Sequence, residues 1–454
     1  MKNSFYFPEE FRLYAPWEKA VDRLLTPLEE FIRSQTASAL ILLFMTVVAL
    51  VMANSPLGKA YHHFFEQELA LRFGSGEISM SLHHWINEGL MTFFFFLIGL
   101  EIKREILVGE LSNPRAALLP VVAAVGGMVL PALLYALVNH GKPTLNGWGI
   151  PMATDIAFAI SVLVLLRRHI PRGLITFLIA LAIVDDLGAV LVIALFYTQT
   201  LNLKALAGAM AVWGLLWIFN RAGLYRSGLY LAGGVVLWWF MLSSGVHATL
   251  AGVLTALAVP SRPKLIPRYF KDVLQKLLRA CEDRPTYPHY TLTPGQKEVI
   301  QAIHAAVESV QPPSLKMEHA LHLPVALGII PLFALANAGL HLEIQKILGI
   351  FHHPVSLGIV LGLVIGKVTG ISGTAWLLNR LGIAPLPRGV RTPHLIGVGF
   401  LAGIGFTMCI FMAELSFPGE KILLEQAKMG ILLASLLAGL IGYLWLRYLA
   451  SPEK

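Results

Sequence analysis

Long apolar runs set the first limit on how this chain can fold. From Gly173 to Tyr197 the chain has 25 residues in which the only charged side chains are Asp185 and Asp186. About 20 apolar residues in a helix are enough to cross a bilayer. Similar runs recur between residues 36 and 449. The sequence therefore predicts an all-α polytopic membrane protein.

The composition agrees with lipid as the main solvent. Of the 454 residues 56% are hydrophobic and 14% are charged, whereas soluble domains average about 25% charged residues. A net charge of +8 would suggest a nucleic-acid partner in a soluble protein, but here we attribute it to basic loops on one membrane face. Two cysteines, Cys281 and Cys409, are too few for a disulfide framework or a cysteine-based metal cluster.

Twelve candidate spans follow from the apolar runs. Their approximate bounds are 36–54, 83–100, 116–138, 148–166, 173–197, 203–220, 227–243, 245–259, 322–342, 355–378, 393–415 and 428–449. Alternate connections carry 27 Lys and Arg on one side and 7 on the other, and Lys367 lies inside a span. Because cytoplasmic loops are enriched in Lys and Arg, both termini are expected in the cytoplasm.

Four regions follow from this assignment. Residues 1–34 form a cytoplasmic N-terminal segment with a surface helix starting near Thr26, and without the apolar core of a cleavable signal peptide. Spans 1–8 occupy residues 35–259, and spans 9–12 occupy residues 319–450. Between them, residues 260–318 form a long cytoplasmic loop with a helical stretch near 296–310. Residues 69–82 alternate around Gly-Ser-Gly, which predicts a β-hairpin on the outer face.

Four ionisable residues lie deep within predicted spans, and they are Asp155, Asp185, Asp186 and Lys367. Such residues are rare in membranes and mark ion or proton pathways. In one interpretation Lys367 only neutralises one acid and joins helices. Two acids would then remain, and they must bind protons or another cation, since adjacent carboxylates resist ionising together. A site that binds either protons or a small hard cation becomes an exchanger once it faces each side in turn.

Two of the predicted spans are interrupted near their middle. Pro151, Thr154 and Asp155 break the fourth span, and several glycines from Gly397 to Gly405 weaken the eleventh. Single glycines are explained by close helix packing, but breaks at matching places in spans 3–5 and 10–12 predict inverted repeats with two discontinuous, crossing helices. Asp155 would balance the facing helix N-termini, and Lys367 the facing C-termini.

Other functions account for fewer of these residues. An intramembrane aspartyl protease leaves Lys367 unexplained, and neighbouring residues on a helix point about 100° apart. The stretch GLVIGKVTG has the wrong glycine spacing for a phosphate loop. A passive channel is disfavoured because a buried lysine and isolated acids trap ions. A sodium-coupled solute symporter remains the serious alternative, although the spans offer few polar side chains for a solute cavity.

Seven specific motifs occur along the chain, and they are ATDIAFA, ALAIVDDLGA, GLEIKRE, SGVHATLAG, PLFALANAG, IGKVTGIS and GIGFTMCIF. Together they resemble the NhaA family of sodium–proton antiporters over roughly residues 35–450. The resemblance implies an electrogenic antiporter of the bacterial inner membrane. It would export Na+ or Li+ in exchange for more than one external proton, and so regulate intracellular pH and sodium. It also implies that the chain is not an enzyme.

The resemblance implies a role for each matching residue. Asp185 and Asp186 would bind Na+ and protons, Thr154 and Asp155 would lie where the broken helices cross, and Lys367 would pair with Asp185. A cluster for pH regulation would consist of Glu101, Lys103, Arg104, Glu105, His247, Glu318, His319 and His322. For the histidines, interfacial anchoring is an equal alternative.

The resemblance also bears on partners. No cofactor is expected, because Na+, Li+ and H+ are the transported substrates, and membrane lipid is the surrounding partner. A homodimer through the outer hairpin 69–82 is expected. The loop 260–318 and the N-terminal segment are longer than expected for the family, which suggests different regulation.

Overall fold

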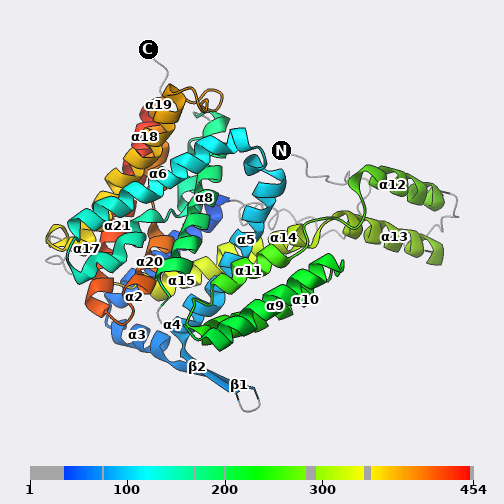
Figure 1. The fold of residues 1–454 in the computed structure, drawn as a ribbon, viewed down its shortest axis with the longest axis horizontal. Helices are drawn as coiled ribbons and strands as arrows, with labels where there is room; N and C mark the ends of the chain where they lie inside the picture. The colour runs from blue at the N-terminus through cyan, green and yellow to red at the C-terminus, as the bar shows by residue number, and fades with distance from the viewer. Residues whose placement is uncertain are drawn as a thin grey trace, which may run out of the picture.

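The computed structural model describes residues 35–73, 76–167, 170–198, 201–282, 293–341 and 349–449, and these are mostly helical (Figure 1). The elements up to residue 258 are α2 (Gln35–Ala53), α3 (Gly58–Glu66), β1 (Glu68–Phe73), β2 (Gly76–Ser81), α4 (Leu82–His84), α5 (Met91–Val108), α6 (Pro114–Val138), α7 (Ile156–Leu165), α8 (Arg172–Phe196), α9 (Leu203–Arg221), α10 (Ser227–Ser244) and α11 (Leu250–Ala258). The remaining helices are α12 (Pro267–Glu282), α13 (Pro294–Val310), α14 (Pro313–Pro324), α15 (Ile330–Asn337), α17 (Pro354–Leu361), α18 (Lys367–Arg380), α19 (Thr392–Ala402), α20 (Phe406–Ser416) and α21 (Lys421–Leu449).

Tighter and wider helical turns connect several of these helices. Turns of 3-10 type are Glu110–Ser112, Pro143–Met152 and Ile350–His352. Wider turns of π type are Trp85–Leu90, Val325–Ile329 and Gly362–Gly366. Each π turn joins two α-helices into one longer helical segment, so a change of helix type does not end the segment.

Among the described residues, eight helices are long and apolar enough to cross a membrane. The number rises to ten if two bent helix pairs, 37–53 with 58–66 and 392–402 with 406–416, are single spans. The total of twelve membrane spans therefore remains a prediction. The predicted span 245–259 contains only the nine-residue helix α11, which is too short to cross a bilayer alone.

The shorter predicted elements can also be compared with the structure. The hairpin is confirmed, since β1 and β2 pair antiparallel with Leu69 opposite Met80. The helix near 296–310 is α13, which starts with a capping box between Thr293 and Gln296. Helix α12 was not predicted, and it pairs with α13 in an arm that extends beyond the ends of α9 and α10 (Figure 1). The predicted surface helix near Thr26 lies outside the described residues.

Close packing of α6 against α18 fixes the position of the buried lysine. A Cβ atom on Gly126 would lie 2.7 Å from the carbonyl oxygen of Gly370, so only glycine lets the two backbones approach this closely. Lys367, at the start of α18, is completely buried beside this contact. Small residues at helix contacts are the usual device for close approach within a membrane.

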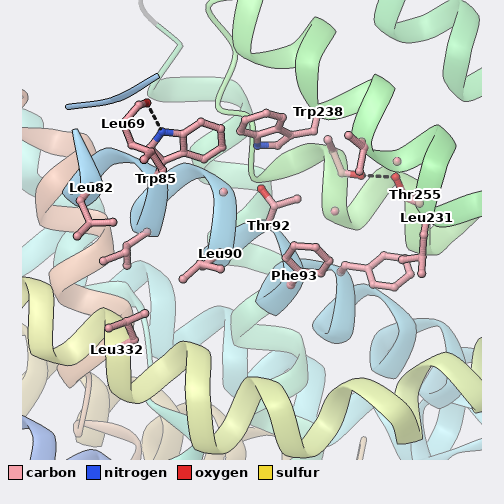
Figure 2. Close-up of a pocket in the computed structure, with 17 residues that line it drawn as sticks. Leu69, Leu82, Trp85, Leu90, Thr92, Phe93, Leu231, Trp238, Thr255 and Leu332 are labelled. Atoms are coloured by element: carbon pink, nitrogen blue, oxygen red, sulfur yellow. Dashed lines mark hydrogen bonds between the residues drawn. The ribbon is translucent and has the colours of Figure 1, made fainter. Parts of the chain in front are cut away.

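An apolar pocket of about 420 Å³ lies between α5, α10 and α11 (Figure 2). At its edge, Trp85 donates a hydrogen bond from Nε1 to the carbonyl oxygen of Leu69, 3.0 Å away, and this ties β1 to the helical segment that continues into α5. Trp85 also stacks on Trp238 of α10. A small cation needs oxygen ligands, so this pocket is not where an ion would bind.

Candidate ion-binding site

The first break in the helical structure is at Ala153–Asp155, between the 3-10 segment 143–152 and α7. The 3-10 segment is unusually long, and tyrosine hydroxyls hold it. Tyr135 donates to the carbonyl oxygen of Thr144 at 2.8 Å, and Tyr197 donates to that of Asn146 at 2.9 Å. Asp155 then caps α7, because its Oδ1 accepts from the backbone N–H of Phe158 at 3.2 Å.

The second break is at Gly403–Gly405, where α19 and α20 meet at a bend of 50°. Gly403 lies against the carbonyl oxygen of Leu363, in the π turn before Lys367, and a Cβ atom there would overlap this oxygen. The sequence analysis predicted an interruption in each of these two helical segments, and the structure has both. The local reason is that Pro151 lacks an N–H and that glycine costs helix stability.

The two breaks contact each other directly. The N–H of Asp155 donates to the carbonyl oxygen of Ile404 at 2.7 Å. In return Asp155 Oδ2 accepts from the N–H of Thr407 at 3.1 Å and from its hydroxyl at 2.5 Å. One carboxylate thus accepts hydrogen bonds at the first turns of both α7 and α20, where the helix dipoles favour negative charge.

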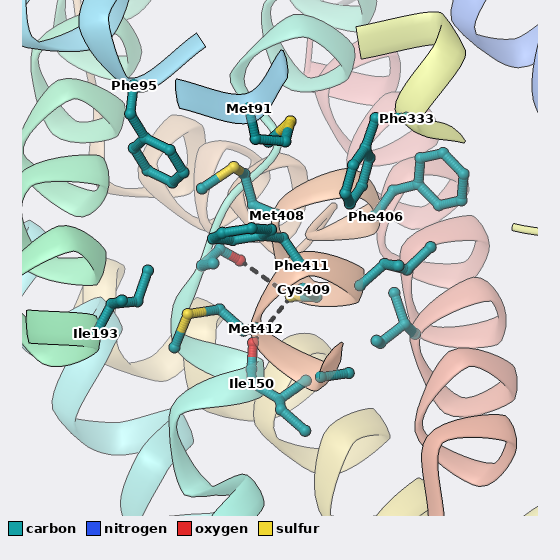
Figure 3. Close-up of a cluster of buried hydrophobic side chains, with 14 of the residues drawn as sticks. Met91, Phe95, Ile150, Ile193, Phe333, Phe406, Met408, Cys409, Phe411 and Met412 are labelled. Carbon is teal, nitrogen blue, oxygen red and sulfur yellow. Dashed lines mark hydrogen bonds between the residues drawn. The ribbon is translucent and has the colours of Figure 1, made fainter. Parts of the chain in front are cut away.

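Cys409 adds a further link between the two segments. Its thiol lies 2.9 Å from the carbonyl oxygen of Ile150 and 3.4 Å from that of Ala153 (Figure 3). Sequence reasoning did not assign a role to Thr407 or Cys409. The sequence feature that could have identified them is their position directly after the glycines of the second break.

Asp185 lies beside this contact on α8 and has two donors. Lys367 donates to Asp185 Oδ2, and the hydroxyl of Thr154 lies 2.6 Å from the same oxygen. The Thr154 hydroxyl also lies 2.8 Å from the carbonyl oxygen of Ala402. Because it has a single proton, Thr154 can donate to only one of these acceptors at a time. The structure therefore brings Thr154, Asp185 and Lys367 together in one hydrogen-bonded group.

Asp186, the next residue on α8, is also buried. Asp186 is 2% exposed and Asp185 is 1% exposed. Neither Asp185 Oδ1 nor Asp186 Oδ1 has a hydrogen-bond partner among the residues that the structure describes. Buried oxygens without a partner are costly, and a proton or a cation relieves that cost. In the described part of the chain, no group of three or more His, Cys, Asp or Glu side chains could hold a resident metal ion.

The residues predicted for pH regulation lie in three parts of the structure: around Arg104 on α5, on the exposed face of α14, and at His247. Arg104 on α5 forms ion pairs with Glu105 at 3.0 Å and with Glu318 of α14 at 2.9 Å. Lys103 donates to the carbonyl oxygen of Leu257 at 2.7 Å and so caps the end of α11. Glu101 precedes this group on α5.

The histidines of that prediction form no ion pair with the group around Arg104 among those found in the described residues. His319 and His322 are exposed on α14. His247 donates from Nε2 to the carbonyl oxygen of Tyr197 at 2.9 Å, and its Nδ1 lies 3.6 Å from Glu88. His247 is thus beside the end of α8 that follows the two aspartates.

Known proteins resemble this chain over almost its full length. A family profile described as Na+/H+ antiporter 1 matches residues 29–446. The Na(+)/H(+) antiporter NhaA of Sulfurimonas denitrificans is 52% identical over 443 residues, which are 98% of this chain and 100% of that protein. Na(+)/H(+) antiporter NhaA 1 of Saccharophagus degradans is 47% identical over 453 residues, which are 99% of this chain and 97% of that protein.

The chain was also compared with solved structures. One that aligns with it is the sodium proton antiporter MjNhaP1 from Methanocaldococcus jannaschii at pH 8. The alignment covers 94% of this chain and 99% of that chain, with a TM-score of 0.47 and 14% sequence identity. The assignment rests instead on the family profile and the curated relatives, which agree with one another and with the apolar helices. The chain belongs to the NhaA family of Na+/H+ antiporters, and is a multi-pass membrane transporter of the secondary type.

Proposed function

We propose that Asp185 and Asp186 bind Na+ or Li+ from the cytoplasm in exchange for more than one external proton. The observation that carries this proposal is the pair of buried oxygens, Asp185 Oδ1 and Asp186 Oδ1, without a hydrogen-bond partner among the described residues. Carboxylate oxygens are the ligands that small hard cations prefer. Export of sodium in exchange for protons would regulate both sodium and pH inside the cell.

The coupling follows from the different partners of the three acids. Asp155 accepts hydrogen bonds from Phe158 and Thr407, so it remains a fixed charge. Asp186 carries one proton when no cation is bound. A cation that contacts both Asp185 and Asp186 displaces Lys367 from Asp185, and the second proton leaves from this pair. In each cycle one cation leaves the cell and two protons enter it. The exchange therefore moves net charge across the membrane and is electrogenic.

Access alternates between the two membrane faces through the interrupted segments. Spans 3–5 and 10–12 form inverted repeats, and the segments 143–165 and 392–416 cross at the site, within twelve spans whose termini are both cytoplasmic. Support comes from the contacts of Asp155 with Ile404 and Thr407, which join the two breaks. Rocking of one repeat against the other would expose the aspartates to each side in turn.

Regulation by pH is assigned to the group around Arg104, with Glu101, Glu105 and Glu318 as its acids. Support comes from the ion pairs that join α5 to α14 through Arg104. His319 and His322 contribute through their charge near Glu318, and His247 acts separately beside Glu88. Residues 260–318, which include α12 and α13, lie on the cytoplasmic side.

The protein forms a homodimer in the bacterial inner membrane through its hairpin. The sheet of β1 and β2 has two strands, and a two-stranded sheet offers its outer edges to another chain. Because Trp85 ties β1 to the segment that leads into α5, a dimer contact at the hairpin would also orient the helices.

A reconstituted system tests the exchange directly. The protein is placed in vesicles that contain a pH-sensitive dye, and Na+, Li+, K+ or a solute such as an amino acid is added. We expect proton flux on addition of Na+ or Li+ that grows with a membrane potential of the favourable sign. A response to solute, without a response to sodium alone, would contradict the proposal and favour a sodium-coupled symporter.

A further inference from the structure

Three charged residues that are buried or mostly buried lie outside the site around Asp185, and each comes from a different element. Glu88 belongs to the π turn Trp85–Leu90, Glu414 to α20 and Lys428 to α21. Their side chains are 9%, 15% and 10% exposed, respectively. Burying a charged group in a membrane protein is costly, so such groups face partners or an ion path.

Lys428 and Glu414 form an ion pair, with Nζ 2.7 Å from Oε1. His83 approaches the same oxygen to 3.8 Å, and its Nε2 lies 2.9 Å from the acceptor Asn337 Oδ1, to which it donates. Glu88 has no lysine or arginine ion pair among those found in the described residues. It accepts from the N–H of Ala248 at 3.1 Å. The formal charge of Glu88, Glu414 and Lys428 together is therefore −1.

These acids line a polar pocket of about 400 Å³. Its walls include His83, Asn87, Glu88, Tyr197, His247 and Glu414. Tyr197 follows the last residue of α8, the helix that carries Asp185 and Asp186. The pocket lies on the hairpin side of the molecule, since His83 and Glu88 follow β2 directly along the chain.

Phe411 also lines this pocket, from the same helix as Glu414. Its ring lies 5.3 Å from that of Phe95 and 6.2 Å from that of Phe333, in the apolar cluster of Figure 3. Thr407, which donates to Asp155, is one helical turn earlier on α20, about 6 Å along the helix axis. An apolar layer around Phe411 thus stands between the polar pocket and the first turn of α20.

We propose that this pocket is the outer mouth of the ion path, and that Lys428 sets its affinity for cations by offsetting the charge of Glu414. This inference rests on the proposed exchange at Asp185 and Asp186. Glu88 and Glu414 attract cations to the mouth. Lys428 weakens that attraction, and so favours release of Na+ where external sodium is abundant.

Opposite effects of two neutral substitutions test the inference. The concentration of Na+ that gives half-maximal exchange is measured at the outer face in right-side-out vesicles and at the inner face in everted vesicles. At the outer face we expect K428Q to lower this concentration about two- to fourfold and E414Q to raise it by a similar factor, as for one unit charge acting through partly solvated protein. The double variant E414Q/K428Q has the original net charge and should return close to the wild-type value.

A purely structural role of the ion pair predicts a different pattern. Both single variants would then change in the same direction, the double variant would remain impaired, and the two faces would be affected alike. Any of these results, or no change at the outer face, would overturn the inference. If E414Q does not reach the membrane, K428Q and the double variant decide the question between them.

K421Q is the matched control, because Lys421 lies two turns earlier on α21 with a side chain that is 85% exposed. Solvent should screen its charge, so the outer-face value should not change. The two proposals also fail differently. A wild-type protein without sodium-driven exchange would contradict the proposed function, whereas intact exchange with unchanged outer affinity in the variants would contradict only the role of Lys428.

Discussion

Asp185 and Asp186 are neighbours in the sequence, but they differ in what surrounds them. Oδ1 of each residue is buried without a hydrogen-bond partner among the described residues, but only Asp185 has donors at its other oxygen, namely Lys367 and Thr154. Substitutions at the two positions should therefore differ in their effects. Lys367 needs the negative charge of Asp185 as its partner, whereas Asp186 is neutral, by the proposed exchange, until a cation binds.

The first prediction concerns Asp186→Asn, which keeps the shape of the side chain and removes its ability to ionise. We expect sodium-driven proton flux to fall to background, because a cation ligand and a proton carrier are lost together. Unfolding temperature in detergent should stay the same or rise, since asparagine is neutral at every pH and never leaves an unpaired charge in this buried position. Asp272→Asn, on the exposed face of α12, is the matched control and should keep full exchange. Robust flux in Asp186→Asn would remove this residue from the site.

The second prediction concerns Lys367→Ala, which leaves Asp185 buried without its counter-charge. Breaking a buried ion pair from one side costs about 3–5 kcal/mol, so the thermal unfolding temperature should fall clearly. Adding Asp185→Asn to the same protein should recover much of that loss, because the carboxylate that lost its partner is then removed as well. A double variant that is less stable than Lys367→Ala would show that the two residues do not act as a pair.

At the level of elements, the break between α19 and α20 depends on Gly403. Its position against the carbonyl oxygen of Leu363 joins the break to the turn that precedes Lys367. The third prediction is that Gly403→Ala reduces both stability and exchange, because the added Cβ pushes the two segments apart. Gly373→Ala on α18 is the control, since nothing lies within 4 Å of a Cβ there.

The expected result for this control is also defined. Replacing glycine by alanine within an unobstructed helix stabilises it by about 0.5–1 kcal/mol, so Gly373→Ala should be neutral or slightly more stable. Stability is read from thermal unfolding and activity from dye-reported flux. Equal behaviour of the two alanine variants would mean that the close contact at Gly403 is relaxed without cost.

Some elements could be predicted well from the sequence, and the reasons are local. The run 173–197 differs from α8 by one residue at each end, because a long apolar run bounded by Pro171 and a polar segment defines its own helix. Helix α12 was missed, although Phe270, Leu274 and Leu277 recur at helical spacing. The charged residues between them led to its assignment as loop.

Contacts between distant segments were harder to predict. Glu414 and Lys428 are visible in the sequence as charges near the ends of apolar runs, but their pairing depends on how α20 packs on α21. The π turn at Gly362–Gly366 has no local signal other than its glycines. The set Asp155, Asp185 and Lys367 could be found from sequence because charges are rare inside apolar runs, whereas their partners, such as Thr407, are ordinary polar residues.

For the molecule as a whole, the question is whether pH acts only at the aspartates. Protons and Na+ compete there in any case, so apparent sodium affinity must rise with pH. The fourth prediction is that Glu318→Gln, which removes a partner of Arg104, moves the pH of half-activation even when Na+ is saturating. The measurement is this pH at several Na+ concentrations, for the variant and the wild type. Lys316→Gln, two residues earlier on α14, serves as the control.

Competition alone makes a different prediction for the same measurement. If the activity profiles of Glu318→Gln and the wild type coincide once Na+ saturates, the two aspartates account for the whole pH response. The ion pairs of Arg104 would then serve only to hold α5 against α14.

The short helix α11 has a consequence for how the chain is assembled during synthesis. Nine residues are too few for the translocon to recognise as an independent membrane segment, and the left-handed Gly245 separates α11 from α10. Its stability comes from α5, which was made about 150 residues earlier. Gly252 packs on the backbone of Phe96, and Lys103 covers the last carbonyl groups of α11. Helix α11 should therefore enter the bilayer only after α5 is in place, so that mutations at Gly252 would first appear as a failure of biogenesis.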